Sequence, residues 1–246
     1  MKTNYPLSQN TYTKNEINAL KKVILSGNFT MGENCQKFES QFSKFFKSKN
    51  SIFVNSGSSA NLLAISALSE FSKIEQKNKK KITKNSEIIV SKLTWPTTVW
   101  PIIQNNFKPI FVDCNLNDLQ MSIQETISKI NNNTFAIFVT HVMGGSVDMQ
   151  PLLKIAKKLG IWIIEDTCES MGAKYRNKFC GTIGDIGTFS TFFSHHISTV
   201  EGGVITTQND KLANLIRSMR AHGWVRDRKD KQKLIKKYKN IDSKFL

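Results

Sequence analysis

The chain lacks any long hydrophobic run. Its 246 residues contain no uncharged apolar stretch of about 18 residues, the length from which a membrane-spanning helix is recognised. Residues 1–6 also lack the apolar segment that follows the first positive charge in a secretory signal peptide. These absences argue against membrane-spanning and exported proteins, and they predict a cytoplasmic one.

Cysteine is scarce and shows no pairing pattern. Cys35, Cys114, Cys168 and Cys180 have no C-x-x-C spacing, and the chain is longer than a small secreted domain. The absence of C-x-x-C spacing argues against a zinc site, and the length of the chain argues against a disulfide framework. We therefore expect reduced thiols and no metal site.

Acidic residues are also few. The chain has 19 Asp and Glu against 35 Lys and Arg, a formal net charge of +16, which by itself favours nucleic-acid binding. Much of the excess lies in two runs, residues 77–84 and 226–239, and neither carries an aromatic platform. We interpret both runs as solvated loop and helix faces, so nucleic acid is the least favoured partner.

Two helices are expected at the start of the chain. Thr13 is a suitable N-cap and Gly27 a suitable stop for the first, whose apolar residues have helical spacing. The second covers residues 33–47, and four phenylalanines on one face are expected to pack in the core: Phe38, Phe42, Phe45 and Phe46. We interpret residues 1–32 as an N-terminal helical arm and residues 33–246 as one large domain.

Beyond these helices, short β-rich runs alternate with helical patterns. That alternation predicts an α/β fold with a mostly parallel central sheet and helices on both of its faces. A further helix is expected near residues 211–220. The expected strands cover residues 51–55, 87–91, 109–113, 135–141 and 161–166.

A turn of small residues follows the first expected strand. Residues 56–61 read Ser-Gly-Ser-Ser-Ala-Asn and lead into an apolar helix over residues 62–68. The start of such a helix presents free backbone N–H groups and a positive dipole end, which suit a phosphate group. A serine that simply caps the helix is at least as common, so this signal is weak alone. Ser190 offers a second hydroxyl for the same phosphate.

Two residues follow strands at the edge where open α/β sheets bind ligands. Asp166 ends the buried run 161–166, and Glu169 three residues later can face the same cavity. The alternative for Asp166 is a helix cap or a structural hydrogen bond. Trp95 follows the strand 87–91, where its ring can stack on a flat ligand, although buried packing is the more common use of an isolated tryptophan.

Taken together, five segments resemble the DegT/DnrJ/EryC1/StrS family of pyridoxal phosphate (PLP)-dependent nucleotide-sugar enzymes. The resemblance implies the large domain of a fold type I PLP-dependent transferase, similar to aspartate aminotransferase, and a homodimer. The chain ends about where family members enter their C-terminal small domain, so we expect that domain to be missing. The segments are Ser-Gly-Ser-Ser at 56–59, Thr-Trp-Pro at 94–96, residues 163–172, Gly-Asp-Ile-Gly at 184–187 and the His-His-Ile loop within 189–203.

The resemblance also implies the roles of individual residues around the cofactor. By this resemblance, the phosphate is held by Gly57, Ser58 and Ser190. Trp95 stacks on the ring, Asp166 pairs with the ring nitrogen, and Glu169 lies near the ring hydroxyl.

One position departs from the aminotransferases of the family. They carry a lysine that forms a Schiff base with PLP six residues before the acid of a Glu-Gly-Gly turn, and here that residue is His195. The nearest lysines are Lys178 and Lys211. Histidine cannot form that stable imine, but it moves protons near neutral pH. His195 is therefore the expected catalytic base.

The resemblance implies dehydration in place of amino transfer. PLP and its aminated form, pyridoxamine phosphate, are the expected cofactors, with L-glutamate as amine donor. The substrate is expected to be a nucleotide-linked 4-keto-6-deoxyhexose, GDP-linked, which loses its C3 hydroxyl as on the route to colitose. A basic surface would attract such a diphosphate. A related dehydratase that ligates an iron–sulfur cluster has cysteines soon after the stretch that matches residues 221–227. This stretch carries none, so the cluster-dependent enzyme is the poorer match.

Two other functions stay open at this point. The chain can be an aminotransferase that uses another lysine, or an inactive truncated paralogue that acts only as a binding protein. Cofactor binding and the fate of the substrate amine would separate these from a dehydratase.

Overall fold

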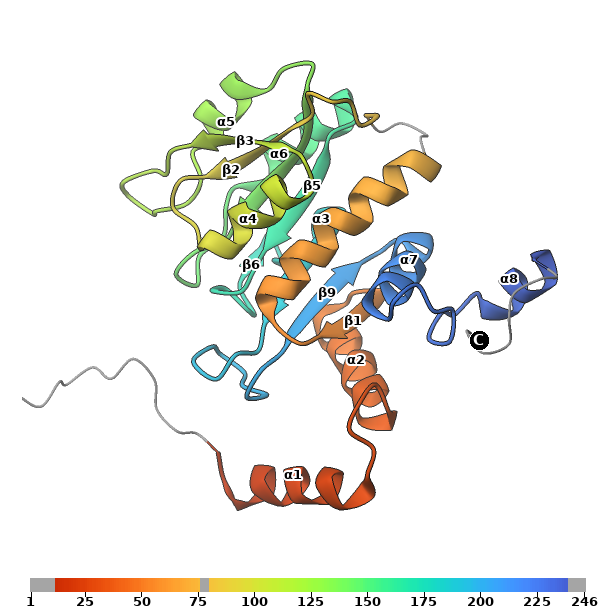
Figure 1. Ribbon diagram of the computed structural model, residues 1–246. Helices are drawn as coiled ribbons and strands as arrows, with labels where there is room; N and C mark the ends of the chain where they lie inside the picture. Colours follow the sequence, from red (N-terminus) through yellow and green to blue (C-terminus); the bar gives the residue numbers. More distant parts are fainter. Residues whose placement is uncertain (1–11, 76–79, 239–246) are drawn as a thin grey trace, which may run out of the picture.

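Seven strands form one mixed sheet in the order β1-β9-β8-β5-β4-β2-β3 (Figure 1). The computed structural model describes residues 12–75 and 80–238. Strand β9 runs antiparallel to β1 and β8, whereas the pairings from β8 through β5, β4 and β2 to β3 are parallel. The strands are β1 (Asn50–Val54), β2 (Glu87–Ser91), β3 (Lys108–Val112), β4 (Thr134–Thr140), β5 (Trp162–Asp166), β8 (Ile186–Ser190) and β9 (Gly203–Thr207). A separate hairpin joins β6 (Lys174–Tyr175) to β7 (Lys178–Phe179).

The central strands are buried on both faces, which explains their apolar sequences. Every residue of β2, β4, β5, β8 and β9 is buried. Strands covered by helices on both faces are rich in Val, Ile and Phe without strict alternation. All five strands expected from the sequence are present, with ends within one residue of the prediction.

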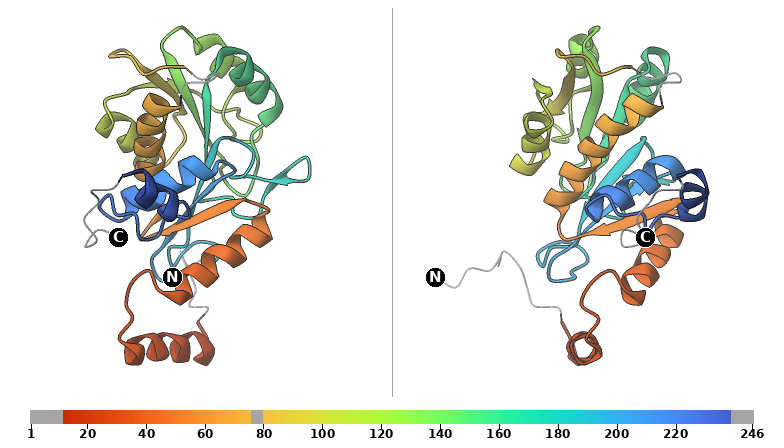
Figure 2. Two further views of the ribbon diagram at one scale, coloured as in Figure 1. Left: turned by 90° about the vertical axis from the view of Figure 1, so that its right-hand side faces the viewer. Right: turned by 45° about the vertical axis from the view of Figure 1, so that its right-hand side comes forward.

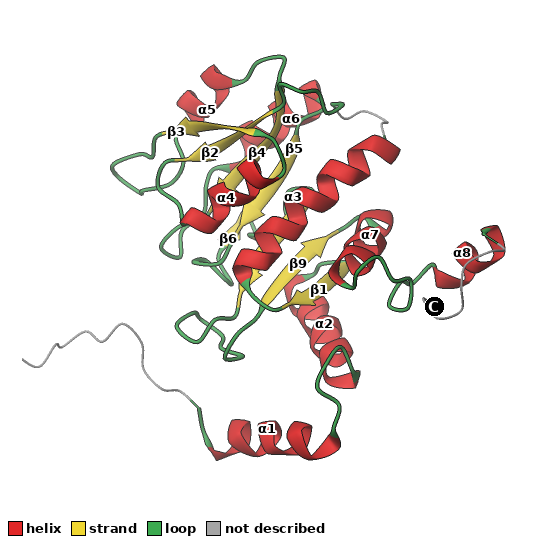
Figure 3. Cartoon of the chain, viewed as in Figure 1, coloured by secondary structure: helices red, strands yellow, loops and turns green. Residues whose placement is uncertain are grey.

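Helices cover both faces of this sheet (Figures 2 and 3). One face carries α3 (Gly57–Ile74), α4 (Pro96–Gln104) and α7 (Asp210–Arg220), and the other carries α2 (Glu33–Phe46), α5 (Ile123–Lys129) and α6 (Met149–Leu159). Because side chains alternate along a strand, Trp162 and Ile164 pack with α3 and α7, while Ile161 and Ile163 pack with α6 on the other face. No helix in the described part of the chain has the length and apolarity needed to cross a membrane.

The first helix, α1 (Lys14–Ser26), has the ends that its sequence predicts. Thr13 and Glu16 form a reciprocal capping box, and Gly27 ends the helix with φ 70°. None of its residues is buried, however, and it lies beyond α2, away from the sheet (Figures 1 and 2). The division at residue 32 stays a prediction.

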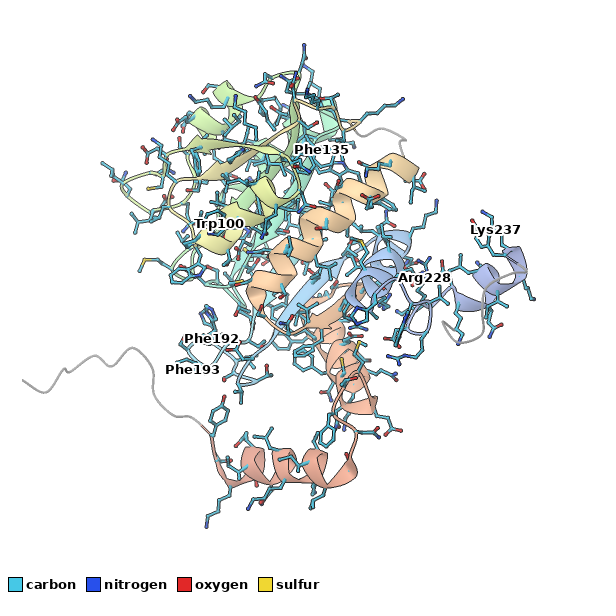
Figure 4. All side chains as sticks on the ribbon, viewed as in Figure 1. Trp100, Phe135, Phe192, Phe193, Arg228 and Lys237 are labelled. Atoms are coloured by element: carbon cyan, nitrogen blue, oxygen red, sulfur yellow. The ribbon has the colours of Figure 1, made fainter. Side chains whose placement is uncertain are left out.

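The basic runs lie at the surface where they are described. Residues 226–238, which include α8 (Lys231–Lys237), contain no buried residue. Figure 4 shows Arg228 and Lys237 at this end of the molecule, away from the sheet. Residues 77–79 of the other run lie outside the described residues.

The phenylalanine face of α2 is only partly in the core. Phe42 and Phe46 are buried and pack against Phe189, as expected. Phe45 is 65% exposed, so its assignment to the core is wrong. At 100° per residue, the buried stripe runs through positions 42 and 46 and leaves position 45 at its margin.

This difference predicts unequal costs for two truncations on α2. Phe46→Ala should lower the free energy of unfolding by about 3–5 kcal/mol, because it opens a cavity under a fully packed ring. Phe45→Ala, the control on the same helix, should cost less than about 1.5 kcal/mol, because its ring is mostly solvated and loses only aromatic contacts. Urea unfolding followed by circular dichroism measures both, and equal losses would contradict the packing described.

Candidate active site

The parallel strands end at one edge of the sheet, where α3 begins. Asp166 is the last residue of β5, and Ser190 is the last residue of β8. The first residue of β9, Gly203, pairs with both Val54 and Ser190. A side chain at Gly203 would collide with the main chain of Ser56. Glycine there lets the start of α3 come close to the ends of β5 and β8, at the edge where open α/β sheets bind ligands.

The start of α3 offers unpaired amides. The Ser56 side chain caps the helix by accepting from the Ser59 amide at 3.0 Å. The amides of Gly57 and Ser58 precede that bond in the first turn, where intrahelical partners do not exist. With 18 residues, α3 is long enough for a full helix dipole, whose positive end lies here. This turn can therefore bind an anion.

Ser190 completes this anion site from the neighbouring strand. A Cβ atom at Gly57 would lie 2.7 Å from the Ser190 Cβ and 3.0 Å from the Cys168 Sγ, so a larger residue would push the helix away. The Ser190 Oγ accepts a hydrogen bond from the Phe192 amide at 3.3 Å, which leaves its own proton for an anion. The structure thus brings Gly57 against Ser190, with Ser58 next to Gly57 in the first turn of α3, and their phosphate-binding role stays a prediction.

Asp166 is held by donors from three directions. Its Oδ2 accepts hydrogen bonds from Asn61 Nδ2 and Thr98 Oγ1, both at 2.8 Å. Its Oδ1 accepts from the Cys168 amide at 3.1 Å. Burial, and then the charge of Asp166, raise the pKa of the Cys168 thiol well above its ordinary value, so that thiol stays protonated. The protonated thiol also hydrogen-bonds the Asp166 carboxylate, but a thiol is a weak donor, so a cationic N–H group can replace it.

The neighbouring carboxylate, that of Glu165, has no such capacity. Its Oε1 accepts from the amides of Ile183 and Gly184 at 2.7 and 2.6 Å. Its Oε2 accepts from the Gly181 amide at 2.9 Å and lies 3.1 Å from His141 Nε2. Four donors fill the carboxylate, so Glu165 is structural and Asp166 is the acid available to a ligand.

His195 lies in the loop between β8 and β9, whose position Phe192 and Phe193 mark in Figure 4. Burial lowers the pKa of His195 from its ordinary value, and the neighbouring His196 acts in the same direction. The carboxylates of Glu169 and Asp166 oppose this shift, so both lie close enough to act on the imidazole. The result is a largely neutral histidine near pH 7, as a proton acceptor requires.

Trp95 lies at the same edge but is not packed inside the protein. It caps the start of α4, and 66% of its surface is exposed. Buried packing, the more common use of such a tryptophan, is therefore wrong here. Its ring is free to contact a ligand or another chain.

Five polar residues of the buried hydrogen-bond network at this edge, beside Asp166, were not expected from the sequence. They come from segments far apart in the chain, so no local motif marks them as a group. One signal was present for Asn61, a polar residue on the same face of α3 as the buried Ala60 and Ala64. The five are Asn61, Thr98, His141, Glu165 and Thr188.

A large cavity lies elsewhere. It has a volume of about 1070 Å³ and lies between α1, α2 and the outer side of α3, with Leu20, Phe29 and Phe38 in its lining. None of the seven expected site residues lines it. This cavity is therefore separate from the candidate site, which we locate at the sheet edge by the hydrogen-bonding groups around Asp166 and at the start of α3.

The sequence profile of the DegT/DnrJ/EryC1/StrS aminotransferase family matches residues 10–241. The chain belongs to this family. It is 41% identical over 224 residues to a GDP-4-keto-6-deoxy-D-mannose 3-dehydratase of Yersinia pseudotuberculosis, covering 91% of this chain and 56% of the relative. The chain therefore spans little more than half the length of that relative.

Solved structures of the DegT/DnrJ/EryC1/StrS family agree. A GDP-4-keto-6-deoxymannose-3-dehydratase with a trapped PLP–glutamate geminal diamine matches with a TM-score of 0.84 and 40% identity, over 91% of this chain and 56% of that one. An aminotransferase from Psychrobacter cryohalolentis matches with a TM-score of 0.80 and 26% identity, over 89% and 53%. These matches confirm the expected fold class, the fold type I large domain with a mostly parallel sheet and helices on both faces.

The lysines nearest in sequence to the loop of this family member are poorly placed to replace His195. Lys211 begins α7 after the end of β9, which runs antiparallel and therefore ends at the opposite edge of the sheet. Its ammonium binds Glu75. Lys178 lies in the β6–β7 hairpin, and residues 189–203 contain no lysine.

The effect of burial and of the neighbouring charges on the pKa of His195 can be tested by titration. In the wild type, the NMR midpoint of the His195 ring should lie below the ordinary value of about 6.5. Glu169→Gln removes a charge that raises the pKa of His195, so the midpoint should move lower still. The comparison with His195→Asn assigns the resonance, and Glu125→Gln on α5 is the control. A midpoint that stays or rises in Glu169→Gln would show that the two side chains do not face each other.

Proposed function

We propose that this chain is the cofactor-binding part of a 3-dehydratase for a nucleotide-linked 4-keto-6-deoxyhexose. The expected nucleotide is GDP and the expected amine donor is L-glutamate. The observation that carries the proposal is a histidine, His195, in the loop beside Asp166 where aminotransferases of this family have a lysine. The dehydratases that match at 40–41% identity, one of them with PLP and glutamate, support the same activity.

The residues at the sheet edge fit PLP. Gly57, Ser58 and Ser190 would hold its phosphate at the positive end of α3, and Asp166 would accept a hydrogen bond from the protonated ring nitrogen. Trp95 would stack on the ring, since its side chain is exposed. When bound, PLP accepts an amine and then serves as an electron sink.

Asp166 and His195 would divide the work of catalysis. Asp166 would keep the ring nitrogen protonated, because its carboxylate is buried and its fourth donor, the Cys168 thiol, is weak enough to be replaced. With the bound cofactor joined through its amine to C4 of the sugar, neutral His195 would take the proton from the C4′ carbon of the cofactor. The electron pair of that C–H bond would pass to the sugar and break its C3–O bond, and the same imidazolium would donate its proton to the departing oxygen, which leaves as water. Glu169 and Asp166 stabilise the imidazolium between these steps.

A second copy of the chain would cover this site. Large apolar residues around the sheet edge are exposed, which is unusual unless a partner covers them. Trp100 on α4 and Phe193 on the loop project outward in Figure 4. We propose a homodimer whose interface includes Leu93, Trp95, Trp100, Met143, Phe193 and Ile197.

The absence of a covalent link to the cofactor gives the first test. After PLP is added and then reduced with borohydride, the intact mass of the wild-type chain should show no pyridoxyl adduct, whereas His195→Lys should gain one. Absorbance should show PLP binding to both, and L-glutamate should convert the bound cofactor to its amine form in the wild type. An adduct on the wild type would favour an aminotransferase lysine, and no binding would favour a protein without the enzymatic activity.

The catalytic assignment gives the second test. His195→Asn should bind PLP as the wild type does, but dehydration of the GDP-linked ketosugar should fall by about 10²–10⁴-fold, the usual contribution of one acid–base group. His222→Asn is the matched control, because His222 lies after α7, outside this loop, and asparagine tolerates its positive φ of 58°; it should keep its activity. Full activity in His195→Asn would contradict the assignment.

A further inference from the structure

A chain of buried hydrogen bonds ends on Asp166. Thr188 Oγ1 on β8 lies 2.6 Å from Asn61 Oδ1 on α3, and Asn61 Nδ2 lies 2.8 Å from Asp166 Oδ2. Thr98 on α4 donates to the same Oδ2 at 2.8 Å. All four side chains are at most 5% exposed. Four elements of the fold therefore meet at one carboxylate oxygen.

The orientation of the Asn61 amide is fixed. The Thr188 hydroxyl donates to Oδ1, and the second Nδ2 proton is directed to the Thr97 carbonyl at 3.3 Å. A flipped amide would place Oδ1 against two acceptors, the negative Asp166 carboxylate and the Thr97 carbonyl, and would lose both bonds that Nδ2 donates to them. Asn61 is therefore a dedicated donor to Asp166.

This arrangement leaves the two oxygens of Asp166 in different states. Asn61 and Thr98 occupy Oδ2, whereas the Cys168 amide donates to Oδ1, and the Cys168 thiol, a weak donor, also hydrogen-bonds this carboxylate. Rotation of the carboxylate would break both bonds to Oδ2. The plane of the group is thus held with Oδ1 as the oxygen available to a ligand.

We propose that Asn61 and Thr98 are positioning residues that present Asp166 Oδ1 to the ring nitrogen of PLP. The inference rests on the proposed function. It also links separate parts of the site, because α3 carries Gly57 one turn before Asn61, and α4 carries Trp95 three residues before Thr98. The helices that hold the phosphate and the ring also set the acceptor for the ring nitrogen.

The experiment compares variants that remove one donor each with variants that keep it. Asn61→Leu and Thr98→Val have similar size but no donor to Oδ2, and Thr98→Ser retains the hydroxyl. Asn214→Leu is the matched control. Asn214 is also buried, but it lies on α7 and accepts hydrogen bonds from the Arg217 side chain and the Lys229 amide. Binding is measured with ¹⁵N-labelled PLP, and the proton on its ring nitrogen is followed by NMR.

The wild type should bind PLP and show a far-downfield ring-nitrogen proton. In Asn61→Leu and Thr98→Val, PLP should bind about tenfold more weakly, as the loss of a charge-assisted hydrogen bond predicts, and the proton should move upfield and broaden. Thr98→Ser and Asn214→Leu should keep the wild-type resonance. Circular dichroism checks that each variant is folded.

The possible failures are distinct. A wild-type resonance in folded Thr98→Val and Asn61→Leu would overturn the positioning role while leaving the proposed function intact. An upfield shift in Asn214→Leu as well would also overturn it, because loss of any buried amide would then have the same effect. No binding of PLP to the wild type would overturn the proposed function and this inference together.

Discussion

The carboxylate of Glu165 is buried at the end of β5 and receives four hydrogen bonds. Three come from amides of residues 181–184 and one from His141, so the carboxylate ties the turn before β8 to the strands β5 and β4. An unpaired buried carboxylate is very costly in free energy. If residues 181–184 moved away from β5, the Glu165 carboxylate would have to become exposed to solvent or protonated. The Val147 amide donates to His141 Nδ1, which leaves the ring proton on Nε2 for Glu165. The register of β8, and with it Thr188 and Ser190, depends on this cluster.

Asp166, the residue after Glu165 on β5, faces the other side of the sheet, because side chains alternate along a strand. The two acids therefore have different surroundings. Glu165 faces α6 and has all its acceptor positions filled by amides and His141, whereas Asp166 faces α3 and α4 and has a weak thiol among its donors. Both carboxylates are rigid because each is bonded to the main chain or to buried side chains. Asp166, the acid proposed to face the ligand, is thus placed by the same strand that carries Glu165.

The sequence predicts the framework better than the contacts within it. Apolar runs and capping residues locate the strands and α1 because those signals are local, and the rule that ligands bind at the carboxyl edge selects Asp166. Asn61 and Thr98 lie 105 and 68 residues from Asp166, so only the folded chain shows that they share one oxygen. The exposure of Phe45 and Trp95 was missed for a similar reason, since burial depends on what lies opposite a side chain.

A histidine in this loop changes what the surroundings must do. A lysine would need to be deprotonated to react with a carbonyl, whereas an imidazole must be neutral to accept a proton and stable when it holds one. Partial burial meets the first requirement by lowering the pKa of His195. The charges of Glu169 and Asp166 meet the second without reversing that shift. Asp166 and Glu169 therefore both act on His195, and in the proposed function Asp166 would also accept from the ring nitrogen.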